Sequence, residues 1–392
     1  MLGSFGGSSS HEVDVDVDAD QDNSSPPNAY LHHHRHQIQP RSNFAASPSL
    51  QMRQLLISCA ELISRSDLSA AHRLISILSS NSSPYGDSTE RLVHQFTRAL
   101  SLRLTRYTTA AAASTSIIST TIAGRDDALV QSSYLSLNQV TPYIRFSQLT
   151  ANQAILEAID GAHHAIHILD FDIMHGVQWP PLMQAVAERY PLPTLRITGT
   201  GSDLEILRRT GDRLAKFAHS LGLRFQFHPL ILLPGEDPIS VASSVLLLPD
   251  ETLAVNCVHY LHRLLRDRDR LALFLHRIKA MSPRVVTVAE REANHNHPIF
   301  QQRFLEAVDH YAAVFDSLEA TLPPNSRERL AVEQIWFGRE IADIVAAEGE
   351  SRRERHERFR SWEVMLRSTG FGNIPLSPFH YPSEGYHASY HQ

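Results

Sequence analysis

Short apolar runs alternate with helical patterns from Gly161 onwards, and this alternation limits the possible folds more than any other feature of the chain. Strands that are joined by helices lie parallel in a doubly wound sheet. One such helix is expected to begin near Pro180, and another to cover Leu204–Leu221 and end at Gly222. The runs expected as strands are Ile166–Leu169, Leu195–Thr198, Leu223–Phe227, Leu253–Cys257 and Val285–Val288. The sequence therefore predicts an α/β fold with a mostly parallel sheet as its core.

The region before this sheet has helical periodicity. Apolar side chains recur every three or four residues from Leu50, and Asp87 with Glu90 has the form of a capping box. The polar, Ser- and Ala-rich stretch Thr108–Thr121 is expected to form a loop, and Thr150–Ile159 a further helix. We expect an all-helical layer whose leucines form either a core or a seam for pairing with another helix.

Residues 1–48 differ in composition from the rest of the chain. They are rich in Ser, Asp, His, Asn and Pro and hold few aliphatic side chains. Such a segment cannot bury enough apolar surface to offset the loss of conformational entropy, so a disordered tail is expected. The cluster His32–His36 lies in this tail and has no fixed geometry for a metal.

The composition excludes several classes of protein. Hydrophobic residues make up 42% of the 392 residues, and the net charge of −6 is opposite to that of a polycation attracted to nucleic acid. The two cysteines, Cys59 and Cys257, fit neither a zinc module nor a disulfide scaffold, which favours the cytosol or the nucleus. No apolar run is long enough for a bilayer and no secretion signal is visible, so we expect a soluble protein without membrane contact.

Polar residues follow the expected strands, at the sheet edge where parallel sheets bind ligands. This edge can be either an active-site crevice or a solvated polar rim. A methyltransferase that uses S-adenosylmethionine, or a dinucleotide enzyme, needs glycines directly after the first strand. The turn DFDIMHG holds only Gly176, and the two glycines of GTGSD follow the second strand. We therefore predict no cofactor and no enzyme activity. The residues at this edge are Asp170, Asp172, Gly199, Gly201, His228, His259, Glu290 and Glu292.

Two groups of side chains have types that bind metals. Asp170, Asp172 and His175 can hold a divalent cation, but capping of the following turn is the favoured interpretation. Glu290, Glu292, His295 and His297 fit neither HExxH nor an EF-hand and are expected to form a polar loop. We predict no metal. GxSxG, Walker A and HExxH motifs do not occur in the sequence, which argues against hydrolases and NTPases.

Two further segments are candidates for contact with partners. Leu261, Leu264 and Leu265 form an LxxLL pattern that can dock into a partner's groove, although leucines at this spacing are more often core. The tract Arg352–Arg360 (RRERHERFR) can touch phosphates or direct nuclear import. Its interleaved Glu354 and Glu357 favour a solvated helix with internal ion pairs.

The stretch IHILDFDIMHGVQWPPLMQA, followed by LRITGTG, resembles the GRAS family of plant transcriptional regulators. Ile166–Asp170 takes the place of the family's VHIID signature, with Ile and Leu at its first and fourth positions. Pro298 and Arg339–Glu340 match the later Pro and Arg-Glu elements, and His310–Tyr311 replaces Phe-Tyr. The residues that match family signatures are Ile166, His167, Ile168, Leu169, Asp170, Gln178, Trp179, Arg339, Glu340, Trp362 and Gly370.

The resemblance also implies boundaries within the chain. A GRAS domain is expected over residues 49–392, preceded by the tail of residues 1–48. Its regions are 49–115 (first leucine-rich), 130–200 (VHIID), 205–240 (second leucine-rich), 250–340 (Pro/Phe-Tyr/Arg-Glu) and 341–392 (terminal). Family members continue beyond the tryptophan–glycine pair into a final strand with two more tryptophans, whereas this sequence ends at HYPSEGYHASYHQ. The terminal region is therefore expected to be truncated.

The resemblance implies a Rossmann-like, methyltransferase-like sheet capped by a helical bundle and located in the nucleus. The partners that it implies are DNA-binding transcription factors and corepressors, with homo- or heterodimers formed through the leucine-rich regions. Segments such as TPYIRFSQLTANQAIL are most similar to the branch of the family that acts in lateral shoot meristems. Direct, sequence-specific DNA binding is the alternative, and a methyltransferase-like enzyme is a distant one.

Overall fold

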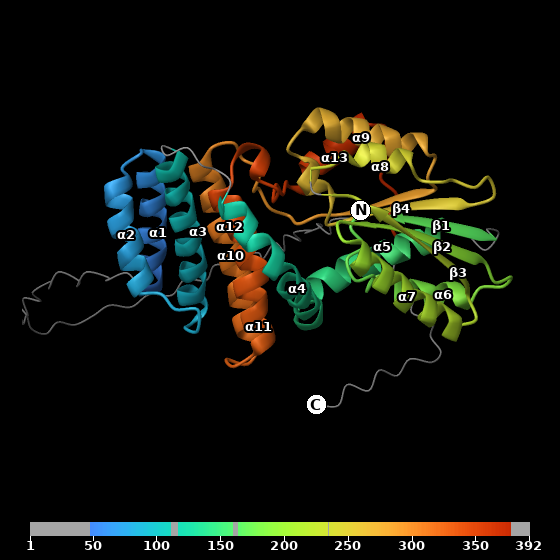
Figure 1. The fold of residues 1–392 in the computed structure, drawn as a ribbon, viewed down its shortest axis with the longest axis horizontal. Coiled ribbons are helices and arrows are strands. Elements are labelled where there is room, and N and C mark those ends of the chain that lie inside the picture. Colours follow the sequence, from blue (N-terminus) through green and yellow to red (C-terminus); the bar gives the residue numbers. More distant parts are fainter. Residues whose placement is uncertain (1–47, 111–116, 160–163, 234, 378–392) are drawn as a thin grey trace, which may run out of the picture.

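The computed structural model describes residues 48–110, 117–159, 164–233 and 235–377, which form a helical bundle beside a layered α/β unit (Figure 1). The disordered tail expected for residues 1–48 lies outside the described residues, except for Pro48, which begins the first helix. Among the described residues, no helix is both long and apolar enough to cross a membrane.

A five-stranded sheet with the order β3-β2-β1-β4-β5 forms the centre of the α/β unit, and all its pairs are parallel. β1 lies in the middle of the sheet, and its residues from Ile166 onwards are all buried, including the polar His167 and Asp170. Asp170 at its end is in register with Gly199 of β2 and Asn256 of β4. The strands predicted from the sequence are confirmed. They are β1 (Ala165–Asp170), β2 (Thr194–Gly201), β3 (Arg224–Ile231), β4 (Thr252–Val258) and β5 (Val285–Ala289).

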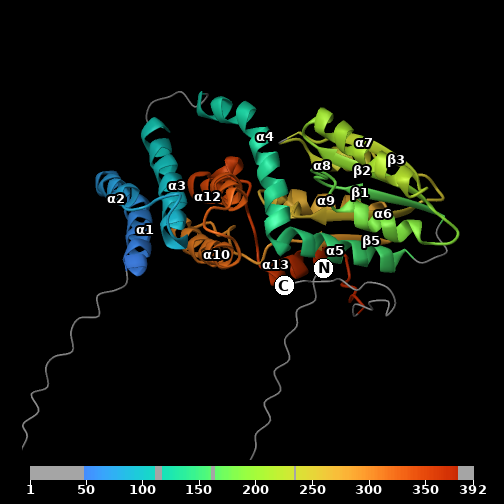
Figure 2. The same ribbon diagram turned by 90° about the horizontal axis from the view of Figure 1, so that it is seen from below.

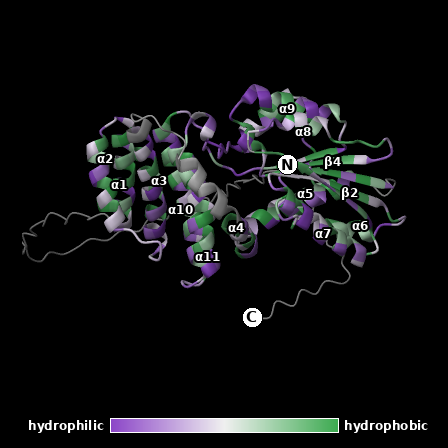
Figure 3. Cartoon of the chain, in the orientation of Figure 1, coloured by the Kyte–Doolittle hydropathy of each residue, from purple (hydrophilic) through white to green (hydrophobic). Residues whose placement is uncertain are grey.

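Helices cover both faces of this sheet (Figure 1). On one face, Trp179, Leu182 and Leu214 pack against the strands. On the other, Phe274 and Trp362 do so. Figure 3 shows the resulting pattern, with apolar strands between helices that carry polar residues on their outer sides. The first face holds α5 (Pro142–Ala158), α6 (Trp179–Ala187) and α7 (Leu204–Ser220), and the second α8 (Pro238–Ser243), α9 (Arg268–Ala280) and α13 (Phe359–Ser368).

The helical bundle combines the N-terminal helices with helices from residues 300–346. Phe96 of α3 packs edge-on against Phe304 and Tyr311 of α10, at ring-centroid distances of 5.5 and 6.3 Å. The leucines of the N-terminal helices are therefore core residues, completed by helices about 200 residues later in the chain. Members of the bundle are α1 (Pro48–Ser64), α2 (Leu68–Ser80), α3 (Ser88–Ala110), α10 (Phe300–Thr321), α11 (Arg327–Ala331), the π-helix η2 (Val332–Phe337) and α12 (Gly338–Ala346). α4 (Ile117–Val140) leads from this bundle to α5 and the sheet (Figure 2).

Two expectations about local structure were wrong. The stretch Thr108–Thr121 was expected as a loop, but α3 continues to Ala110 and α4 begins at Ile117, and residues 111–116 between them lie outside the described residues. The tract Arg352–Arg360 was expected as a solvated helix. Residues 352–358 instead form an extended, largely buried segment between the 3-10 helix η3 (Gly349–Ser351) and α13.

Candidate functional site

The end of β1 carries a buried carboxylate that is held from two sides. Asp170 accepts hydrogen bonds from the Trp179 indole Nε1 at 2.9 Å and from Asn256 Nδ2 at 2.7 Å. Burial raises the pKa of Asp170 to about 7, against the opposing effect of these two donors. Asp170 therefore links the end of β1 to the first residue of α6 and to β4.

A network of side-chain amides continues from this carboxylate between β1 and β4. Gln178 and Asn256 exchange hydrogen bonds of 3.1 and 3.2 Å, and Thr287 donates to Asn256 Oδ1 at 2.8 Å. Asn152 of α5 closes the network with a 2.8 Å bond to the carbonyl of Gln178. The strand order reverses between β1 and β4, and doubly wound proteins bind their ligands at such a point. Here buried side chains of the chain itself fill that crevice.

His167, the other polar residue of the β1 signature, also lies against side chains of the protein itself. His167 Nε2 lies 2.9 Å from Thr198 Oγ1, and His167 Nδ1 lies 3.0 Å from an Arg196 guanidinium nitrogen. Arg196 in turn pairs with Glu251. Burial, and then the charge of Arg196, lower the pKa of His167 to about 4, so the imidazole is neutral near pH 7.

The turn after β1 has bulky side chains where a cofactor-binding turn has glycines. Phe171 is fully buried and stacks on Tyr260 at a centroid distance of 5.2 Å. Asp172 has a φ of 67° and pairs with Arg263, and Gly176 has a φ of 63°. The side chain of Asp172, which was expected to cap this turn, instead joins the turn to the segment after β4 through this ion pair.

A cavity of about 420 Å³ opens beside this turn, at the carboxyl ends of β1, β2 and β3. Of the residues expected at this edge, only Asp172 and Gly201 line it. Its charges are mixed and partly paired, since Arg263 contacts Asp172 and Arg270 lies 3.0 Å from Asp237. A further wall comes from residues 350–353, of which Arg352 and Arg353 were expected on a solvated helix.

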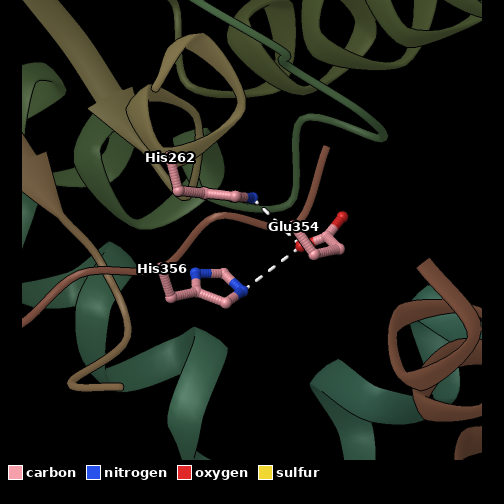
Figure 4. A group of neighbouring side chains, drawn as sticks. All are labelled: His262, Glu354 and His356. Carbon is pink, nitrogen blue, oxygen red and sulfur yellow. Dashed lines mark ion pairs between the residues drawn. The ribbon is translucent and has the colours of Figure 1, made fainter. Parts of the chain in front are cut away.

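A second group of polar side chains lies deeper, where the C-terminal segment crosses the edge of the sheet. His262 Nδ1 is 2.7 Å from Glu290 Oε2, and His262 Nε2 is 3.2 Å from Glu354 Oε2. His356 Nε2 lies 3.2 Å from the same oxygen of Glu354 (Figure 4). Burial opposes the charge on His262, but the two carboxylates raise its pKa to about 9.

This group, which we call the His262 cluster (His262, Glu290, Glu354 and His356), was missed by the sequence analysis. Glu290 and His295 were expected in a polar loop, but the side chain of Glu290 is 3% exposed and His295 is fully buried. Glu354 and His356 were expected on a solvated helix. No local pattern brings these residues together, because they come from three separate parts of the chain.

Of the remaining signature residues, Glu340, Trp362 and Gly370 have structural roles, and Arg339 is exposed. Glu340 is buried and accepts hydrogen bonds from Tyr311 Oη at 2.9 Å and Arg291 Nη2 at 2.7 Å. Trp362 donates to the carbonyl of Glu357 at 3.1 Å. Gly370 has a φ of 85° and ends α13.

The LxxLL leucines lie on the 3-10 helix η1 (Leu261–Leu264) and not on an α-helix. Leu261 and Leu265 are buried in the core, and Leu264 is half-buried at the wall of the cavity. A partner's groove could reach the two buried leucines only if this turn opened.

Comparison with known proteins shows which family this chain resembles. The GRAS domain family model matches residues 52–385. The chain is 50% identical over 385 residues to Scarecrow-like protein 18 of Arabidopsis thaliana, which covers 86% of each protein. It is 45% identical to Protein MONOCULM 1 of Oryza sativa subsp. japonica, over 85% of this chain and 82% of that protein.

A solved structure of another protein has a similar fold. The crystal structure of SCL7 from Oryza sativa matches with a TM-score of 0.68 and 36% sequence identity, over 85% of this chain and 87% of that one. The Rossmann-like sheet with a helical cap, expected from the resemblance, is confirmed. From the family match, these relatives and the shared fold, we conclude that the chain belongs to the GRAS family.

Proposed function

We propose that this protein is a nuclear regulator of transcription that works as an adaptor between DNA-binding transcription factors and corepressors. Membership of the GRAS family and the similarity to MONOCULM 1, a Lateral Suppressor-type relative, support a regulatory role in plants. The resemblance of its segments to that branch supports a role in the formation of lateral shoot meristems.

The observation that carries the proposal is the filled crevice between β1 and β4. Asp170 bonds Trp179 and Asn256, and Gln178 bonds Asn256 and Asn152. These signature side chains therefore support the packing of the fold and do not face a reacting molecule. A function that does not use this crevice depends on other parts of the protein, such as its surface or the cavity beside Asp172. This favours binding of partners over an enzyme activity.

The surface offers a face suited to another protein. Tyr143, Phe146 and Leu149 of α5 are 43%, 56% and 48% exposed, and their spacing of three residues places them on one side of the helix. Gathered apolar side chains of this kind on a protein surface are typical of contacts with partners. We call these three residues the α5 face.

The adaptor role can be tested by cross-linked immunoprecipitation of the full chain from shoot-apex nuclei. We expect DNA-binding factors to be recovered with the wild type and to fall at least tenfold with the double variant Phe146→Ser/Leu149→Ser. The matched control, Leu273→Ser/Val364→Ser, changes two exposed apolar residues on α9 and α13 and is expected to recover them fully. Recovery of the chain outside the nucleus, or equal recovery from both variants, would contradict the proposal.

A gel-shift experiment separates the adaptor from the alternative of direct DNA binding. The adaptor is expected to shift promoter DNA only when a partner factor is present. A sequence-specific shift by the recombinant chain alone, weakening steeply with salt, would favour direct binding, because neutralised phosphates release counterions.

A further inference from the structure

We propose that the His262 cluster is a zinc site that fixes the C-terminal segment 352–358 to the edge of the sheet. Its ligands would be the imidazoles of His262 and His356 and the carboxylate of Glu354. The three candidate ligand atoms lie within 4.8 Å of one another (Figure 4). Two imidazoles and one glutamate are a donor set that zinc accepts in proteins, with a fourth position for water or another ligand.

The distances within the cluster suit a tetrahedral ion. Bonds of about 2.0–2.1 Å to nitrogen and oxygen place neighbouring ligand atoms about 3.3 Å apart. Glu354 Oε2 is 3.2 Å from His262 Nε2 and 3.2 Å from His356 Nε2. Two of the three edges are therefore already at the separation that zinc requires, and the two imidazoles point at the same carboxylate oxygen.

The surroundings of His262 suit a metal ligand, because a second carboxylate, that of Glu290, holds the other nitrogen of its ring. Its Nδ1 faces Glu290 at 2.7 Å, which leaves Nε2 directed at the proposed ion. A carboxylate that accepts the other N–H of a ligating histidine fixes the orientation and tautomer of the ring. Glu290 would have this role, and its side chain is almost fully buried.

The second observation is His356, which is 1% exposed: its Nδ1 has no hydrogen-bond partner among the described residues, and its Nε2 lies 3.2 Å from Glu354 Oε2 without the geometry of a hydrogen bond. Buried polar atoms without a partner are costly, so each requires an explanation. Coordination of an ion by Nε2 satisfies the nitrogen that is directed into the cluster. The nearby cations do not replace the ion, because Arg263 pairs with Asp172 and Arg291 with Glu340.

The backbone is arranged to present these ligands. Asp343 Oδ2 accepts the amides of Arg353 and Glu354 at 2.8 and 2.7 Å, and the amide of His295 donates to the carbonyl of His356 at 2.9 Å. Residues 350–353 also form a wall of the cavity. The ion would therefore join the last part of the described chain to the sheet and complete that wall.

The test uses the full chain with His32, His33, His34 and His36 replaced by Ala, since these tail histidines could bind zinc themselves, and with a purification tag that contains no histidine. We expect one zinc per chain to remain after dialysis against a weak chelator. X-ray absorption is expected to show only nitrogen and oxygen neighbours at about 2.0–2.1 Å, with outer scattering from imidazole. Loss of all zinc in dialysis, or a sulfur neighbour, would overturn the proposal.

Variants in the same tail-substituted background assign the ligands. His356→Gln is expected to weaken zinc binding at least tenfold and to abolish the rise in Tm on adding zinc. Glu290→Gln removes no ligand and is expected to weaken binding about 10- to 100-fold through the orientation of His262. The control, His276→Gln, changes an exposed histidine of α9 and should leave zinc affinity unchanged.

If these variants do not fold, a spectroscopic measurement on the protein with its cluster unchanged can still refute the proposal. Long-range ¹⁵N NMR of the unmutated cluster, in the zinc-loaded protein, is expected to show His262 with a proton on Nδ1 alone. A doubly protonated His262 in zinc-saturated protein would mean that the two carboxylates hold an imidazolium and not a metal, and would overturn the assignment.

Discussion

Trp179 is the residue on which the turn after β1 most directly depends. Trp179→Phe removes the donor to the buried carboxylate of Asp170 and leaves a small cavity. We expect the free energy of unfolding to fall by about 2–4 kcal/mol, measured by urea denaturation, because a buried acceptor loses its partner. Trp336→Phe is the control, since Trp336 Nε1 has no hydrogen-bond partner among the described residues, and it should cost less than about 1.5 kcal/mol. Equal losses in the two variants would contradict this role.

His167 should make the stability of the protein depend on pH. Its pKa is about 4 in the folded protein and about 6.5 in the unfolded chain, so the unfolded chain binds the proton more readily. The contribution of His167 is therefore complete above pH 6.5 and is lost as the pH falls towards 4, by on the order of 2–3 kcal/mol.

The variant His167→Gln tests this linkage, because glutamine can still bond Thr198 but does not titrate. Denaturation at pH 7.5 and 5.0 should show a smaller fall in the free energy of unfolding for this variant than for the wild type. Identical falls would mean that other groups, such as Asp170, set the pH dependence.

At the scale of the elements, α7 packs against β3 through a glycine. A Cβ at position 211 would lie 2.3 Å from the ring of Phe227. Gly211→Ala is therefore expected to lower the free energy of unfolding by about 1–3 kcal/mol, although alanine favours a helix more than glycine does. Asp212→Ala, at an exposed position of the same helix, should change it by less than about 0.5 kcal/mol. A stabilised Gly211→Ala variant would show that the two elements are not packed as described.

Helices and strands were predictable from the sequence where the spacing of apolar residues matches the side that the fold buries. β1 is buried from Ile166 to its end and holds the apolar residues Ile166, Ile168 and Leu169, and β3 alternates between half-buried and exposed residues over much of its length, as its sequence indicates. The segment 352–358 was not predictable, because its alternating charges fit a helix with internal pairs. In the fold these charges pair with distant residues instead, as Glu357 does with Arg268 and Arg352 with the carbonyl of His295. The His262 cluster depends on this segment and was missed for the same reason.

At the scale of the whole molecule, the helical bundle depends on two parts of the chain that are far apart in sequence, residues 48–110 and residues 300–346. Arg91 of α3 forms a buried ion pair of 2.7 Å with Glu333 of η2, 242 residues later. A fragment of residues 48–158 lacks this partner and the apolar side chains of α10 and α12. We expect it to be unfolded or aggregated by circular dichroism and NMR. A monomeric fragment that unfolds cooperatively would contradict this arrangement.

The central claim is that a Rossmann-like sheet has been filled at its ligand crevice and serves as a scaffold for binding other proteins. Isothermal titration calorimetry of the full chain with S-adenosylmethionine tests this claim most directly. The filled crevice predicts no measurable heat of binding at ligand concentrations up to the submillimolar range. Stoichiometric binding with a micromolar Kd would contradict it.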